Sequence, residues 1–233
     1  MKKIGLVIFG IALVVGVVFA NILSFGRLSD RMFNVSFDLC GTKGSGNVVS
    51  ERRDISEFSG IDVGGIYKVD VTIGEDFSVE IETDDNLLPL ISTEVDGDVL
   101  KIESSKRFKP SDQVRVHVTA PDIRSLDISG AARIEVTGVA NDELTVDASG
   151  ASKVNLSGET QKLTVDVSGA TSVDAEQLTA QDAAVDSSGA GNVAVNVTGE
   201  LRADGSGASK IYYSGSPATV VKKTSGAGKV VAR

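Results

Sequence analysis

The tripeptide Ser-Gly-Ala occurs six times in the second half of the chain, and its regular spacing is the strongest constraint on the fold. Neighbouring copies lie 20, 19, 20, 18 and 19 residues apart. Four residues after each glycine the residue is always Ile or Val, and alternating apolar residues precede most copies. Alternation places apolar side chains on one face of a strand, so each unit is predicted to be two short strands joined at Ser-Gly-Ala.

A repeat of about 19 residues without helical spacing predicts a β-solenoid, in which each unit is one coil stacked on the next by parallel strand pairing. One coil alone cannot bury its apolar side, but neighbouring coils complete it. Parallel crossovers are overwhelmingly right-handed. We therefore expect an all-β fold, a right-handed parallel β-helix over residues 121–233. The alternation begins earlier, so residues 54–120 are expected to be β-rich and to supply the first coils.

The Ser-Gly-Ala sites are predicted to be the corners of the coils. Glycine adopts backbone angles that other residues avoid, and the small Ser and Ala side chains allow corners to stack. A serine nucleophile is disfavoured because the one histidine, His117, lies outside the repeat and no base accompanies the serines. The predicted corner residues are Gly130, Gly150, Gly169, Gly189, Gly207 and Gly226.

A column of aspartates stands three residues before these glycines, and its alternation with apolar residues turns it outward. Like charges on neighbouring strands repel. Solvent and the nearby lysines Lys153, Lys162 and Lys210 could offset this repulsion, or bound Ca²⁺ could do so. Alternatively, the carboxylates could line a groove that binds or cleaves sugars. A uniform column singles out no catalytic pair. The candidate residues are Asp127, Asp147, Asp166, Asp186 and Asp204, with Lys223 in the sixth place.

The amino terminus has the pattern of an export signal. Lys2 and Lys3 precede an uncharged, mostly apolar run from residue 4 to residue 20. Such a run either anchors the chain in the inner membrane through residues 4–25 or is cleaved as a signal peptide. We assign residues 1–26 to this segment and residues 27–53 to a linker, and we expect the body to be extracytoplasmic.

Composition excludes several kinds of chemistry. The single cysteine, Cys40, permits no internal disulfide, and one Cys with one His cannot form a Cys/His zinc site. The net charge of −9 disfavours nucleic acid as a partner. No cofactor is expected.

The combined pattern of residues 54–232 resembles the bacterial family described as "putative auto-transporter adhesin, head GIN domain". That resemblance implies a β-helical extracytoplasmic domain without established catalytic residues. We therefore expect a non-enzymatic envelope domain that binds an envelope protein or a glycan; a polysaccharide-binding or polysaccharide-cleaving β-helix is the alternative. The resemblance is carried by Asp54-Ile55 with Phe58 and Ile61, Gly65-Ile66-Tyr67 with Val69 and Val71, Asp85-Asn86-Leu87-Leu88, Gly97 with Leu100 and Ile102, and the Ser-Gly-Ala series.

Overall fold

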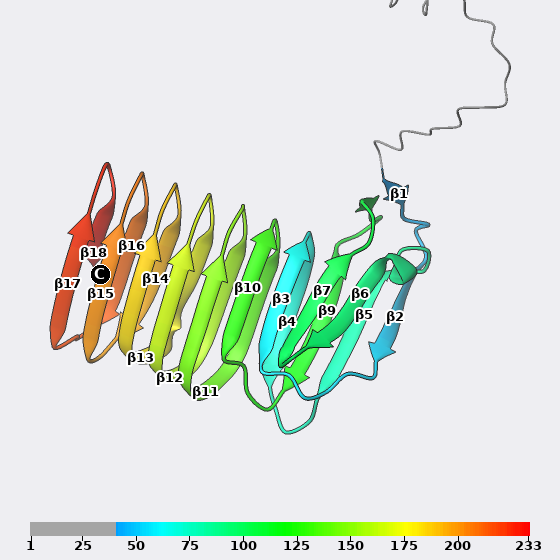
Figure 1. Cartoon of the computed structure of the whole chain (residues 1–233), viewed down its shortest axis with the longest axis horizontal. Helices are drawn as coiled ribbons and strands as arrows, with labels where there is room; N and C mark the ends of the chain where they lie inside the picture. The colour runs from blue at the N-terminus through cyan, green and yellow to red at the C-terminus, as the bar shows by residue number, and fades with distance from the viewer. Residues whose placement is uncertain (1–40) are drawn as a thin grey trace, which may run out of the picture. The chain divides into compact units, whose positions relative to one another are not determined.

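The computed structural model describes residues 41–233, which form an elongated row of stacked β-coils closed at one end by hairpins (Figure 1). The strands are β1 (Thr42–Lys43), β2 (Val48–Arg53), β3 (Gly60–Gly65), β4 (Tyr67–Ile73), β5 (Ser78–Asp84), β6 (Ile91–Asp96), β7 (Val99–Ser104), β8 (Phe108–Lys109), β9 (Val114–Ala120), β10 (Ser125–Gly130), β11 (Arg133–Ala148), β12 (Lys153–Val167), β13 (Ser172–Ser187), β14 (Asn192–Val197), β15 (Glu200–Gly205), β16 (Lys210–Gly215), β17 (Thr219–Thr224) and β18 (Lys229–Ala232), with one 3-10 turn, η1 (Leu88–Leu90).

The predicted β-solenoid is confirmed, with about five turns. Each turn leads from one Ser-Gly-Ala corner to the next, and equivalent residues pair in parallel register from β10 to β18. Strands β11, β12 and β13 are long because each continues through a bend from one side of the coil to the other. The handedness of the winding stays a prediction.

Identical apolar side chains stack inside the coils and form a narrow core. Ile134, Val154, Val173, Val193 and Ile211 are at most 1% exposed and lie one above another. Burying an aliphatic side chain of this size contributes roughly 1.5–3 kcal/mol. The core is only a few side chains wide, which explains how the chain folds with 5% aromatic residues and no Trp.

Strands β3 and β4 form an additional half-coil at the N-terminal end. β3 pairs with β10 and β4 with β11, both in parallel, so Gly65 stacks on Gly130 although 65 residues separate them. The intervening chain builds two antiparallel pairs, β6 with β7 and β5 with β9, which cap the solenoid. Asp96 and Gly97 lie at the turn between β6 and β7, where Asp96 pairs with Val99.

The predicted linker over residues 27–53 extends too far. Within the described part of that range, β2 pairs antiparallel with β5, and β1 pairs in parallel with β8. Asp84, which is 1% exposed, secures this segment by accepting hydrogen bonds from the Gly46 N–H at 2.7 Å and from the Ser111 N–H at 2.9 Å. These partners are distant in sequence, so local composition alone suggested a linker.

The predicted signal segment, residues 1–26, lies outside the described residues. Between residues 41 and 233, no helix has the length and apolar character needed to cross a bilayer.

Candidate functional site

The Ser-Gly-Ala corners form a continuous hydrogen-bonded stack along the solenoid. The six predicted corner glycines have φ between 69° and 94°. The alanine N–H after each glycine donates to the glycine carbonyl of the preceding coil, at 2.7 to 2.9 Å. A Cβ on any of these glycines would lie 2.4 to 2.9 Å from that same carbonyl oxygen. Both the backbone conformation and the close approach of the coils therefore favour glycine.

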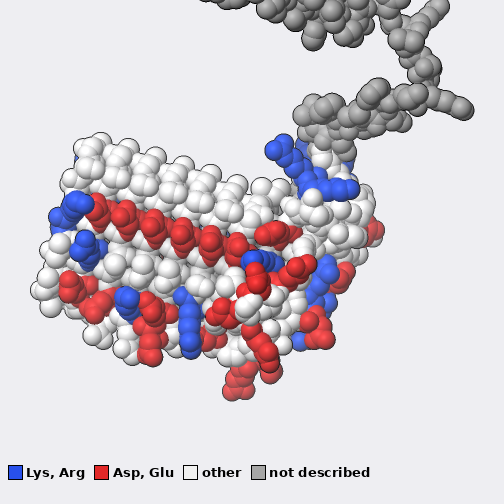
Figure 2. Space-filling view, in the orientation of Figure 1, with Lys and Arg blue, Asp and Glu red and all other residues white. Residues whose placement is uncertain are grey.

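The five predicted aspartates lie in register on the strand side that precedes the corner, and they form a ladder. Asp62 of β3 adds a sixth carboxylate, because it pairs with Asp127. Lysines occupy both ends of the row: Lys101 pairs with Asp62, and Lys223 pairs with Asp204. Figure 2 shows acidic side chains in one row along the coils. We call these six aspartates the carboxylate ladder.

The ladder concentrates negative charge on one face. Burial raises the pKa of Asp62, Asp127 and Asp186, and neighbouring carboxylates raise these pKa values further. At one end of the row, Lys223 Nζ lies 2.9 Å from Asp204 Oδ2. This lysine therefore offsets part of the repulsion at that end of the row. Of the lysines that the sequence suggested for this role, Lys162 pairs with Glu143 instead, at 2.8 Å. Lys153 and Lys210 form no ion pair with the ladder within 4.0 Å.

A metal ion on the ladder stays a prediction. Calcium takes about six to eight oxygen ligands, whereas each step of a linear row offers two neighbouring carboxylates. Within the described range 41–233, no group of three or more His, Cys, Asp or Glu side chains is arranged to hold a metal ion.

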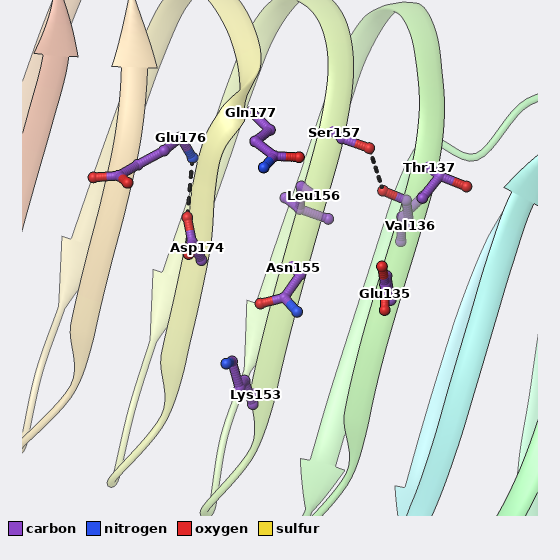
Figure 3. Close-up of a pocket in the computed structure, with 10 residues that line it drawn as sticks. All are labelled: Glu135, Val136, Thr137, Lys153, Asn155, Leu156, Ser157, Asp174, Glu176 and Gln177. Carbon is purple, nitrogen blue, oxygen red and sulfur yellow. Dashed lines mark hydrogen bonds between the residues drawn. The ribbon is translucent and has the colours of Figure 1, made fainter.

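A polar cleft of about 300 Å³ lies on the other strand side, after the corner (Figure 3). It forms where β12, with 15 residues, lies between β11 and β13, which have 16 residues each. The register shifts between Val136 and Val139 of β11, and between Ala175 and Thr179 of β13, which leaves Glu176 to Leu178 without partners on β14. Such β-bulges redirect side chains and often lie next to binding sites. The cleft is lined by Glu135, Val136, Thr137, Lys153, Asn155, Leu156, Ser157, Asp174, Glu176 and Gln177.

The central row of the cleft is a carboxylate, an amide and a carboxylate. Glu135, Asn155 and Asp174 pair in register on three successive strands, and Figure 3 shows Asn155 between the two acids. Asp174 Oδ1 accepts a hydrogen bond of 3.2 Å from the backbone N–H of Glu176. Glu176 itself forms an ion pair with Arg233, whose guanidinium lies 4.2 Å from the centre of the Tyr212 ring.

The sequence did not identify this cleft. The spacing of the glycines shows that the coils differ in length by one or two residues, but not where the extra residues lie. The only available signal was the polar sequence of residues 174–177, where Asp174, Glu176 and Gln177 surround a single apolar residue, Ala175.

Comparisons with known proteins agree with this architecture. The profile of the family described as "putative auto-transporter adhesin, head GIN domain" matches residues 57–217. No curated protein gives a significant match.

Solved structures give the same fold at low sequence identity. A "putative adhesin" from Bacteroides fragilis aligns with a TM-score of 0.70 and 21% identity, covering 82% of this chain and 99% of that one. A "putative adhesin" from Parabacteroides distasonis aligns with a TM-score of 0.61 and 22% identity, with the same coverage. A "putative lipid binding protein" from Parabacteroides distasonis aligns with a TM-score of 0.55 and 19% identity, also over 82% of this chain and 99% of that one.

Proposed function

We propose that this chain is a non-enzymatic interaction module that works outside the cytoplasm and binds a component of a cell envelope. The chain belongs to the family described as "putative auto-transporter adhesin, head GIN domain". The observation that supports this proposal most is the carboxylate ladder. It repeats one charged group at a spacing of about 4.8 Å along the coils. Such a surface suits many small, equivalent contacts with an extended partner.

Export is part of the proposal. Lys2 and Lys3 before the apolar run of residues 4–20 support a cytoplasmic amino terminus with the body on the other side of the inner membrane. The absence of an enzymatic role is also proposed: the ladder is uniform and does not distinguish an acid from a base, which general acid–base catalysis requires.

Two measurements on the full-length chain test the proposal. Alkaline phosphatase fused after Arg233 should be active in a bacterium that expresses the fusion, since this reporter works only after export. Cells that expose the chain should then be retained in a flow chamber on envelope material from other bacteria better than cells without it. Correct export without any gain in retention would argue against adhesion, and an inactive fusion would argue against the location.

A further inference from the structure

The polar cleft between β11 and β13 has the charge of a site for a singly positive ligand. Arg233 neutralises the charge of Glu176. The remaining charged residues of the cleft are Glu135, Asp174 and Lys153. None of these three has an ion-pair partner within 4.0 Å among residues 41–233. Two carboxylates and one ammonium leave one net negative charge. A ligand with a single cationic group would balance it.

The accessible walls of the cleft are polar. The two apolar lining residues, Val136 and Leu156, are 0% and 2% exposed and turn into the core. A lysine side chain or an alkyl amine binds best where its methylene groups can lie along apolar surface, and this cleft offers very little. The exposed groups instead are carboxylates, amides, hydroxyls and an ammonium, which accept and donate hydrogen bonds and suit a ligand with several hydroxyl groups.

The spacing of these groups also suits a ring with polar groups on both sides. Glu135 and Asp174 lie one strand on either side of Asn155, at about 4.8 Å per step. Carboxylates accept from hydroxyl or ammonium groups, and the Asn155 amide both donates and accepts. The volume of about 300 Å³ is at the lower end for small-molecule sites.

We propose that this cleft binds a sugar residue that carries a free amino group. The ammonium lies against Glu135 or Asp174, and the hydroxyl groups bond to Asn155, Lys153 and the opposite carboxylate. The inference rests on the proposed interaction role, because it names a ligand class for one site on the same domain. It can fail separately, since its test measures binding in solution and does not depend on export or adhesion.

The test is isothermal titration of the full-length chain with four probes. These are a tetrasaccharide of glucosamine, its fully N-acetylated form, cellotetraose, and spermidine, which has amines but no hydroxyl groups. We expect the glucosamine tetramer to bind at least tenfold more tightly than each of the others. Hydrogen bonds between charged groups are stronger than neutral ones, so the loss of one carboxylate should weaken binding roughly tenfold or more.

Variants locate the site. Glu135→Gln and Asp174→Asn should reduce the preference for the amine over the acetylated sugar, a ratio that does not depend on the fraction of folded protein. Asp147→Asn removes the same charge from the carboxylate ladder and should leave that ratio unchanged.

Four results would overturn the inference. Equal binding of spermidine would point to cationic groups in general, such as lysines of a partner protein. Equal binding of the acetylated sugar, or no measurable binding of the amino sugar, would exclude recognition of the amine. An equal effect of Asp147→Asn and Asp174→Asn would reveal unspecific attraction to an acidic protein.

Discussion

Gly169→Ala should strongly destabilise the solenoid, and the structure separates two causes. Gly169 has φ = 80°, and an alanine in the left-handed region costs about 1–2 kcal/mol. Its Cβ would lie 2.5 Å from the carbonyl oxygen of Gly150, so the two coils must move apart. That movement strains the 2.8 Å hydrogen bond from the Ala170 N–H to the same oxygen. Overpacking and the weakened bond add about 2–4 kcal/mol.

Gly97→Ala is the matched control. Gly97 has φ = 68°, but a Cβ there would have no atom of the described part of the chain within 4 Å. It should therefore show only the backbone cost. For a protein of this size, the additional 2–4 kcal/mol corresponds to a melting temperature lower by roughly 5–15 °C. Thermal unfolding followed by circular dichroism measures both variants. If the two melt at the same temperature, the close stacking of corners does not limit the choice of residue at Gly169.

Three further predictions concern polar groups. A hydrogen bond from the Ser111 hydroxyl, and then bonds from backbone N–H groups, lower the pKa of Asp84. This carboxylate therefore stabilises the fold above its unfolded pKa, and the stabilisation is lost as pH falls through the lower folded pKa. Ser111→Ala should move acid unfolding, measured by circular dichroism, to higher pH. The pKa of Asp127 is raised, so its charged form opposes folding above that pKa. Asp127→Asn should raise the free energy of unfolding, measured in urea at neutral pH, by a few tenths to about 1 kcal/mol, and by less at high salt. Ser187 Oγ is buried and has no hydrogen-bond partner among residues 41–233. Ser187→Ala should raise stability in urea by about 1 kcal/mol, and unchanged stability would mean that this hydroxyl is satisfied.

The repeat alone was sufficient to predict the solenoid, because the positions that pair between coils are marked within each unit. An apolar residue follows each Ser-Gly-Ala glycine at a fixed distance, so equivalent residues can be aligned from the sequence. Five of the six ladder aspartates followed from the same rule. Asp62 was missed because its corner is written Gly64-Gly65-Ile66 and the cap separates it from the next coil. The alternation of Ile61, Asp62 and Val63 was the signal that could have placed it.

The cleft and the cap depend on contacts that no local pattern encodes. The cleft exists because neighbouring strands bend at different residues, so its lining is decided by register shifts between β11, β12 and β13. The attachment of residues 45–47 depends on Asp84 to Asn86, about 40 residues further along the chain. Sequence reasoning therefore succeeded for the repeated coils and stopped where strands of different length or distant segments meet.

The hairpin cap at the N-terminal end gives the solenoid a direction of assembly. A chain made from its amino terminus completes β2 to β9 first, and β3 and β4 then present open edges on which β10 and β11 can pair. Each finished coil is the template for the next, so the order of synthesis and the order of stacking coincide. In such a linear array a defect acts mainly on the coils next to it. Hydrogen exchange should accordingly be slowest beside the cap and faster, coil by coil, toward β17 and β18.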